Sequence, residues 1–233
     1  MCQQSRFLNN FTKFFMQIQW FGQSYFKIIV KNNGDDVIIV TDPFDNSYGL
    51  KASKTSADIV TISHDHNDHN NLDAIKGESF IIDSPGEYET KGVFIYGIPA
   101  WHDDKEGQER GNITIYRISA ENMNLVHLGD LGHELSDEQL EKIGDVDILL
   151  IPVGGTFTID AKKANDIISE IEPRIVLPMH YDLPGLKFKS GEKLDDIDKF
   201  LKISGLPSET MDKFKINKKD LPQDETKVVV LNS

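Results

Sequence analysis

Hydrophobic and polar residues alternate along the first half of the chain with the two-residue period of half-buried β-strands. The alternation begins at Met16 and returns over residues 25–31 and 37–41, and Asn33-Gly34 lies between these two later runs as a hairpin turn. Further short apolar runs predict strands at residues 59–63, 80–82, 88–90, 93–98, 112–118 and 124–128. The first half of the chain is therefore predicted to be rich in strands.

The second half of the chain combines apolar runs with helical patterns. Ser136 and Gln139 have the spacing of a capping box that opens a short helix. Asp160 is placed to cap a second helix, and Gly205 to end a third. The apolar positions of these last two helices are Ala164, Ile167, Ile168 and Ile171, and Leu194, Ile197, Phe200 and Leu201. Buried strands are predicted at residues 147–152, 174–177 and 227–231, so the pattern favours a layered α/β architecture.

Residues 1–15 differ from the rest of the chain, because they carry phenylalanines at helical spacing on a short polar segment. We interpret them as an N-terminal extension outside the fold; the alternative is a terminal helix docked on the body of the protein. From Met16 onwards the chain has no repeat and no linker long enough to divide it. Its length suits one domain, which we predict over residues 16–233.

The chain carries 38 acidic and 25 basic side chains, which gives a formal charge of −13. With 39% hydrophobic and 27% charged residues, it has the composition of a soluble globular protein. Its acidic surface repels phosphates, so nucleic acid is not an expected partner. The single cysteine, Cys2, cannot form an internal disulfide, and a cytoplasmic location is predicted. There is no apolar run of about 20 residues to cross a membrane and no secretory signal pattern.

All seven histidines lie between residues 64 and 180, and three of them fall in the hexapeptide His64-Asp65-His66-Asn67-Asp68-His69. His64 and His66 leave a predicted strand two residues apart and project the same way, so they can hold one cation. If the chain then turns, Asp68 and His69 can bind a second cation close by. The simpler interpretation of the hexapeptide is a solvated polar loop. Four potential ligands at the end of one strand favour a metal-binding site instead. Imidazole and carboxylate suit zinc, manganese or iron.

Three more potential ligands come directly after predicted strands. Asp42 follows residues 37–41, Asp130 follows residues 124–128, and His180 comes shortly after residues 174–177. Function gathers where the strand ends of an α/β layer meet loops. Asp42 or Asp130 alone is best explained as a turn residue that caps a strand. Together with the hexapeptide, the three residues would complete two metal-binding shells.

These motifs resemble the metallo-β-lactamase fold superfamily. The hexapeptide pattern His64-x-His66-x-Asp68-His69 is similar to the superfamily's signature, and the later pieces come in its order and rough spacing: Asp42, His102, Gly129-Asp130-Leu131-Gly132-His133 and Pro178-Met179-His180-Tyr181. Other segments look like the branch of small bacterial and archaeal metal-dependent hydrolases near the ascorbate-phosphate lactonase group: Gly22-Gln23-Ser24, Ser84-Pro85-Gly86-Glu87-Tyr88 and residues 152–158. The resemblance runs from about Met16 to the C-terminus.

The resemblance implies a four-layer αββα sandwich with a site for two divalent metal ions, zinc before manganese or iron. It assigns His64, His66 and a third histidine to the first metal, and Asp68, His69 and His180 to the second. Asp130 would bridge both ions, and Asp42 would orient the ligand histidines. His102 is the favoured third histidine. Its rivals are His127, interpreted as a buried neighbour of Asp130, and His133, interpreted as a substrate contact or proton donor.

Three differences between this sequence and other branches of the superfamily argue against those branches. The later motifs contain no cysteine, so the zinc-ligand cysteine of one major antibiotic-hydrolysing class is missing. The hexapeptide has His66 where the di-iron oxygen-reducing branch has glutamate. The chain is also too short to hold the additional nuclease domain of the RNA-processing branch.

The implied function is hydrolysis of a small ester, lactone or phosphoester by a hydroxide that bridges the two metals. Asp68 would orient this hydroxide and accept its proton, and His133 or a metal-bound water would protonate the leaving group. Arg110 and Tyr181 are the candidate substrate contacts, although a solvated surface arginine is as good an interpretation of Arg110. Two alternatives remain: a phosphodiesterase or ribonuclease acting on nucleotides or RNA, and a non-catalytic metal-binding module. The sequence makes no prediction about the oligomeric state.

Overall fold

The computed structural model describes residues 15–51, 53–188 and 191–233. Nearly all of the predicted N-terminal extension lies outside these ranges. Its boundary at Met16 coincides with the first residue of the first strand. Within the described ranges, no helix is long and apolar enough to cross a membrane.

The first sheet has six strands in the order β15-β1-β2-β3-β5-β7. Its strands are β1 (Met16–Trp20), β2 (Phe26–Asn32), β3 (Asp35–Thr41), β5 (Ile59–Thr61), β7 (Phe80–Ile82) and β15 (Phe214–Ile216). The predicted hairpin is confirmed, because β2 and β3 pair antiparallel from Asn32 opposite Asp35 onwards. Strands β3, β5 and β7 are parallel, so β3 and β5 deliver the residues that come after them to the same edge.

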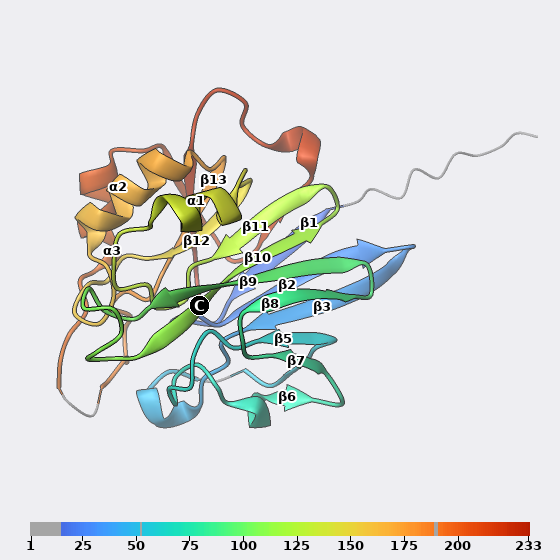
Figure 1. Cartoon of the computed structure of the whole chain (residues 1–233), viewed down its shortest axis with the longest axis horizontal. Coiled ribbons are helices and arrows are strands. Elements are labelled where there is room, and N and C mark those ends of the chain that lie inside the picture. The colour runs from blue at the N-terminus through green and yellow to red at the C-terminus, as the bar shows by residue number, and fades with distance from the viewer. Residues whose placement is uncertain (1–14, 52, 189–190) are drawn as a thin grey trace, which may run out of the picture.

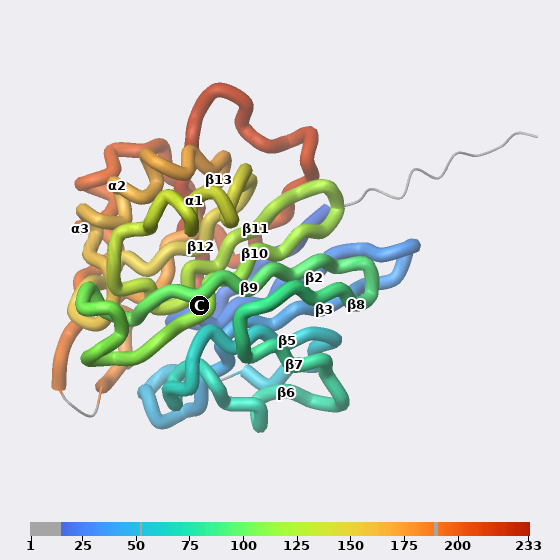
Figure 2. Tube along the Cα trace, in the orientation of Figure 1, coloured from blue at the N-terminus to red at the C-terminus, as the bar shows by residue number. Residues whose placement is uncertain are grey.

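The second sheet has eight strands in the order β14-β16-β13-β12-β11-β10-β9-β8. They are β8 (Gly86–Thr90), β9 (Val93–Trp101), β10 (Asn112–Ala120), β11 (Met123–His127), β12 (Ile148–Pro152), β13 (Ile175–Met179), β14 (Ser208–Met211) and β16 (Lys227–Leu231). Strands β8 to β11 form an antiparallel meander, and β11, β12, β13, β16 and β14 are parallel. Figure 2 shows how the chain passes from the blue and teal strands of the first sheet to the green strands that begin the second.

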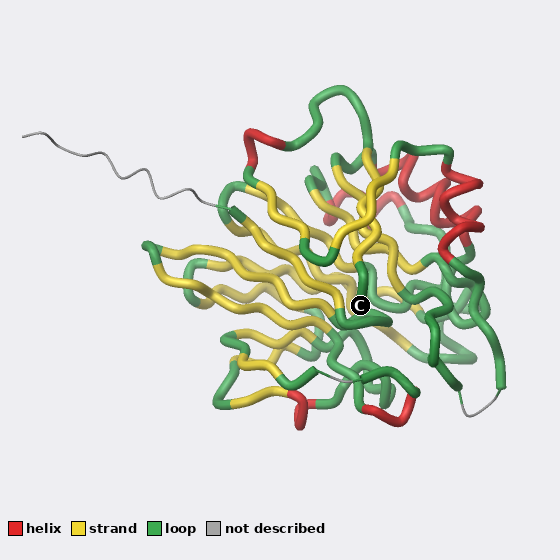
Figure 3. The backbone as a smooth tube through the Cα atoms, turned by 180° about the vertical axis from the view of Figure 1, so that it is seen from behind, coloured by secondary structure: helices red, strands yellow, loops and turns green. Residues whose placement is uncertain are grey.

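The two sheets pack face to face around one large apolar core. Along β1 every second side chain is buried, and Met16, Ile18 and Trp20 share a cluster with residues of the second sheet such as Ile98 and Ile115. The helices α1 (Asp137–Ile143), α2 (Ala161–Ile171) and α3 (Ile197–Ser204) gather on the side of the second sheet (Figures 1 and 3). The predicted α/β sandwich is confirmed.

The outer face of the first sheet is covered differently from a four-layer αββα sandwich with α-helices on both sides. In the described ranges, this cover consists of the short helices η1 (Asn46–Tyr48) and η2 (Leu72–Ala74) and the two-stranded pair β4 (Thr55–Ser56) and β6 (Ile75–Lys76). A smaller apolar cluster joins this cover to the sheet through Phe44 and Ala57, which pack with Val40 and Val60. The third short helix, η3 (Lys218–Asp220), precedes β16.

Local side-chain chemistry explains where the α-helices begin and end. Both bonds of the predicted capping box are present, from the Gln139 N–H to Ser136 Oγ and from the Ser136 N–H to Gln139 Oε1. Asp160 accepts from two backbone N–H groups at the start of α2. Asp196 caps α3 in the same way, and Gly205 ends it with a left-handed φ of 61°.

The loops after β12 and β13 approach each other closely at Gly154. A Cβ atom built on Gly154 would lie 2.2 Å from the carbonyl oxygen of His180 and 3.0 Å from Tyr181 Cα. Backbone atoms cannot move aside as easily as the end of a flexible side chain. The absence of a side chain at residue 154 therefore sets the position of His180.

We expect Gly154→Ala to lower the free energy of unfolding by about 1–3 kcal/mol, because it overpacks a buried backbone contact. It should also lower metal content, because His180 must shift. Gly205→Ala is the matched control: it strains a left-handed position at about 1–2 kcal/mol, but nothing lies within 4 Å of the new Cβ. Thermal unfolding and elemental analysis of both variants check this. Full metal content in Gly154→Ala would contradict it.

Candidate metal centre

The hexapeptide forms a tight turn directly after β5, closed by a hydrogen bond from the His69 N–H to the His66 carbonyl at 2.9 Å. The turn brings the imidazoles of His66 and His69 against that of His64, the first edge-on at 79° and the second tilted by 43°. The ring centroids of His64 and His66 are 4.5 Å apart, and those of His64 and His69 are 4.2 Å apart. A strand end followed by one turn thus concentrates three potential ligands from six consecutive residues.

His102 completes the first group of potential ligands. It follows β9, and its ring lies 4.8 Å from that of His64 and 5.2 Å from that of His66, measured between centroids. One ligand atom from each of His64, His66 and His102 lies within 4.8 Å of the others. Of the three histidines considered for this position, His102 is the one with this geometry.

A second group consists of Asp68, His69 and His180, again with ligand atoms within 4.8 Å of one another. His180 comes from the end of β13 and has a left-handed φ of 51°, which turns the chain sharply at this residue. The group therefore combines one carboxylate and two imidazoles from two distant segments. Nitrogen and oxygen ligands of this kind suit zinc.

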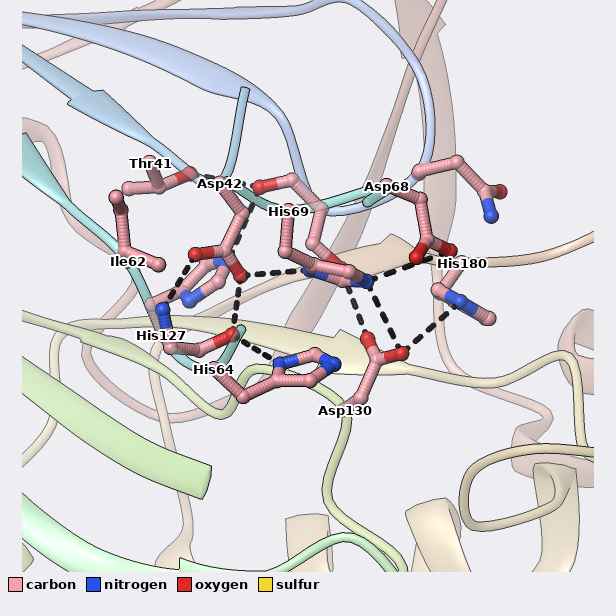
Figure 4. A network of polar contacts seen from close by, with 12 residues as sticks. Thr41, Asp42, Ile62, His64, Asp68, His69, His127, Asp130 and His180 are labelled. Carbon is pink, nitrogen blue, oxygen red and sulfur yellow. Dashed lines mark hydrogen bonds and ion pairs between the residues drawn. The ribbon is translucent and has the colours of Figure 1, made fainter. Parts of the chain in front are cut away.

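Asp130 lies between the two groups. Its Oδ2 atom is 3.1 Å from His69 Nε2 and 3.2 Å from His180 Nε2 (Figure 4). The same atom is 3.5 Å from His102 Nε2. Its other oxygen accepts a hydrogen bond from Ser24 Oγ at 3.2 Å. One carboxylate oxygen thus faces imidazoles of both groups, which is the placement that a shared ligand requires.

Asp42 fixes the orientation of the ligand histidines through their Nδ1 atoms, on the side away from Asp130. Its Oδ2 atom lies 3.0 Å from His69 Nδ1 and accepts a hydrogen bond from Ser63 Oγ at 2.6 Å. Ser63 Oγ in turn lies 2.9 Å from His64 Nδ1. Both Nδ1 atoms are thereby engaged, so Nε2 of each ring is left for the centre of the site (Figure 4). Ser63 was not predicted, because a serine before a histidine motif carries no signal of its own.

The polar atoms of the site fit bound metal ions. Nε2 of His64 and Nε2 of His69 are buried and form no well-aligned hydrogen bond, although the latter lies close to the Asp130 carboxylate. Such buried nitrogens are costly unless a partner takes their lone pairs. Imidazole nitrogens with free lone pairs beside buried carboxylates form the donor set that a divalent cation binds.

The pKa shifts show that the buried carboxylates of the site are ionised and require positive charge beside them. Burial lowers the pKa of His64 to about 2. Burial alone would raise the pKa of Asp130, but His180 and His69 outweigh it and hold this pKa well below its usual value. Burial likewise opposes the charged form of His69, yet Asp130 and Asp68 raise its pKa well above the usual range. Without metal, a proton on His69 supplies the charge that the carboxylates need; a bound cation would replace that proton and leave the Nε2 lone pair free to bind it.

The other two histidines lie outside both groups. His127 is fully buried at the end of β11, with Nε2 3.2 Å from the Ser24 carbonyl, as expected for a buried neighbour of Asp130. Both ring nitrogens of His133 contact backbone groups. Nε2 accepts a hydrogen bond from the Trp101 N–H at 3.1 Å, and Nδ1 lies 2.6 Å from the Glu134 carbonyl oxygen. In this arrangement His133 has no free nitrogen to protonate a substrate.

A cavity of about 440 Å³ opens over the site. Its lining residues are Tyr48, His66, Asn67, Asp68, His102, Glu109, Arg110, Asp130, Phe157, His180 and Phe188. Arg110, one of the two predicted substrate contacts, is among them. The other, Tyr181, is buried against Trp20 with a centroid distance of 5.0 Å and does not line the cavity. A larger cavity of about 590 Å³ touches only His64 of the ligand groups, so the smaller one is the candidate substrate site.

One side of the cavity is bounded by the rim loop, residues 103–111. Asp103 organises this loop, because its carboxylate accepts hydrogen bonds from the N–H groups of Lys105, Gly107, Glu109 and Arg110 at 2.7–3.0 Å. Burial raises the pKa of Asp103, but these four donors outweigh it and lower the pKa to about 2. The loop that carries Arg110 is therefore held by one ionised side chain.

The comparisons with known proteins decide the family. The sequence model described as "Beta-lactamase superfamily domain" matches residues 17–180. The chain belongs to the metallo-β-lactamase superfamily. The predicted resemblance is thereby confirmed, and residues from Asp42 to His180 all lie within the matched region.

Relatives of this superfamily member occur in archaea and bacteria. A metal-dependent hydrolase of Methanopyrus kandleri is 28% identical over 199 residues, which are 71% of this chain and 84% of the relative. A metal-dependent hydrolase of Thermococcus onnurineus is also 28% identical, over 72% of this chain and 85% of its own. The crystal structure of a Thermotoga maritima protein of the superfamily is 36% identical and has a TM-score of 0.73, covering 93% of this chain and 98% of that one.

We expect Asp103→Asn to loosen the rim loop, because a neutral amide offers weaker acceptors to the four N–H groups. Hydrogen exchange of the amides of Lys105, Gly107, Glu109 and Arg110 should accelerate, while the exchange of the strands stays unchanged. Asp104→Asn, at an exposed neighbouring carboxylate, is the control and should leave these amides as they are. Equal exchange in both variants would show that Asp103 does not organise the loop.

Proposed function

We propose that this protein hydrolyses a small ester, lactone or phosphoester with two divalent metal ions, zinc before manganese or iron. The comparisons already identify the chain as a metal-dependent hydrolase of the metallo-β-lactamase superfamily, and the proposal adds the substrate class and the number of ions. The observation that supports two ions is the position of Asp130 Oδ2, within 3.5 Å of histidines from both ligand groups.

The proposed ligands are divided between the two ions. His64, His66 and His102 would hold one ion; Asp68, His69 and His180 would hold the other; and Asp130 would be shared. When bound, such a pair of ions lowers the pKa of water towards neutrality and supplies positive charge for the oxyanion that develops on the substrate. Asp42 keeps its orienting role, through His69 directly and through Ser63 to His64.

The remaining side chains of the cavity have separate tasks. Burial opposes ionisation of Asp68, but His69 outweighs it and lowers the pKa of Asp68 to about 2, so this carboxylate is ionised and can bind a cation. The role proposed for Asp68 in orienting the attacking water and accepting its proton is supported by its position beside His69 and His180 and not by its pKa, since a pKa of about 2 makes it a weak base. Burial raises the pKa of Tyr48 to about 12, with Asp68 contributing, so the tyrosine stays protonated and can donate a hydrogen bond. The Arg110 guanidinium at the cavity wall binds an anionic group of the substrate.

We expect His66→Ala to fold normally, to contain less metal and to show no hydrolysis, because His66 is exposed to the cavity and contributes little to the core. Circular dichroism, elemental analysis and a panel of esters, lactones and phosphoesters measure the three effects. His133→Gln is the control, since His133 lies outside both ligand groups; it should retain metal content and a kcat within about tenfold of the parent protein, an estimate for a residue that makes no proton transfer.

Different results of this experiment exclude different functions. Unchanged turnover in His66→Ala would contradict the two-metal hydrolase. Loss of turnover in His133→Gln with full metal content would instead identify His133 as the proton donor. Full metal content without turnover on any member of the panel would favour a non-catalytic metal-binding module. Salt-sensitive binding and cleavage of RNA would favour the nuclease alternative.

A further inference from the structure

Three aromatic side chains line the candidate substrate cavity beside the metal ligands. Tyr48 belongs to η1, Phe157 follows β12 and Phe188 follows β13, so three distant segments contribute one ring each. The centroid of Phe188 is 6.1 Å from that of Tyr48 and 4.9 Å from that of Phe157. We call this continuous row of Tyr48, Phe188 and Phe157 the aromatic wall.

The aromatic wall is connected to the metal site at one point and to a cation at another. The ring of Phe188 lies 6.5 Å from the ring of His180, measured between centroids. At the Phe157 end, the guanidinium carbon of Arg110 lies 5.6 Å from the ring centroid. A hydrogen bond from Arg110 to the Thr156 carbonyl at 3.3 Å also holds the guanidinium in this place.

Arg110 gives this end of the wall its charge. Among the described residues that line the cavity, it is the only lysine or arginine. Glu109, which also lines the cavity, pairs with Lys105 on the rim loop. The guanidinium is therefore available to an anionic group placed next to the wall.

Neither ligation of metals nor hydrolysis requires an apolar aromatic surface at this place. All three rings are only partly buried, so they retain surface that faces the cavity. Aromatic surface of this kind gains most from another flat ring, which adds edge-to-face or offset stacking to the ordinary burial of apolar area. The cavity volume of about 440 Å³ suits a ligand of one ring with a short polar substituent.

We propose that the substrate carries a flat aromatic or heteroaromatic ring that packs on the aromatic wall, with an anionic group next to it at Arg110. The bond that is hydrolysed then lies beside the metal ligands, at the His180 side of the wall. This inference rests on the proposed function, because it names the substrate class of the same site. The aromatic wall would thus favour aryl esters and aryl phosphoesters over their alkyl counterparts.

Binding of two non-hydrolysable probes to the zinc-loaded protein tests the ring directly. Phenylphosphonate and butylphosphonate have the same charged group but differ in the flat ring. Isothermal titration calorimetry should give a Kd for phenylphosphonate that is lower by about fivefold, the order expected for one aromatic contact. Equal values of Kd for the two probes would overturn the proposal.

Substitutions in the wall assign this preference to its residues. Phe188→Leu and Phe157→Leu keep an apolar side chain but remove the ring, so each should raise the Kd of phenylphosphonate about fivefold and leave that of butylphosphonate within twofold. The matched control is Phe94→Leu, at a phenylalanine of β9 that is 57% exposed and lies outside the cavity. An equal loss of affinity for both probes, or an effect of Phe94→Leu, would contradict the role of the wall.

Hydrolysis measured on the same proteins separates this inference from the proposed function. Ring-dependent binding without any hydrolysis would refute the hydrolase and retain the aromatic wall as a binding surface. Hydrolysis with the same phenyl-to-butyl ratio of kcat/KM in Phe188→Leu as in the unmodified protein would retain the hydrolase and refute the wall, because the difference in leaving group is the same in both proteins. Preferred hydrolysis of the phenyl compound, lost in Phe188→Leu and not in Phe94→Leu, would support both.

Discussion

A buried carboxylate needs positive charge or several hydrogen-bond donors close by, and Asp130 imposes this requirement on the whole site. Its side chain is only 3% exposed, and around one of its oxygens lie nitrogens from His69, His102 and His180. None of these histidines is near Asp130 in the sequence. The two sheets must therefore be fully assembled before the charge of Asp130 can be compensated, and this links the fold to the chemistry of the site.

The fold meets this requirement by ending several strands at one edge of the sandwich. Strands β3 and β5 of the first sheet lead to Asp42 and to the hexapeptide, while β11 and β13 of the second lead to Asp130 and His180. Parallel pairing within each sheet brings its strand ends to the same side. The close backbone contact at Gly154 then sets the last ligand in place. Stability of the sandwich and occupation of the site are coupled for this reason.

The parts of the site that depend on local sequence could be predicted from it. Four ligands within six residues need only one turn after a strand, and Asp42, Asp130 and His180 were predicted because each comes just after an apolar strand. The family resemblance favoured His102 over His127 and His133, and the structure supplies the physical reason, because the choice depends on how three loops pack. In the same way the capping box predicted α1, whereas β14 was missed because its residues are mostly exposed and show no apolar alternation.

Contacts that no motif assigns could not be predicted. Ser24 and Phe157 stand in segments that resemble the family branch, but nothing in those segments indicates that Ser24 donates to Asp130 or that Phe157 lies beside Phe188. Ser63 donates two hydrogen bonds to Asp42, and neither Ser63 nor the other two rings of the aromatic wall belong to a motif. Tyr181 shows the opposite case: it stands next to the ligand His180, yet its side chain points into the core against Trp20. The left-handed φ of His180 turns the chain sharply between the two side chains, so adjacency to a ligand does not place a side chain in the site.

The most direct test of this account is anomalous X-ray scattering at the zinc edge from crystals of the zinc-loaded protein. The account predicts two peaks about 3.5–4 Å apart, the separation usual for two-metal hydrolytic sites, with Asp130 between them. One peak should lie among His64, His66 and His102, and the other among Asp68, His69 and His180. A single peak, or two peaks that do not share Asp130, would contradict it.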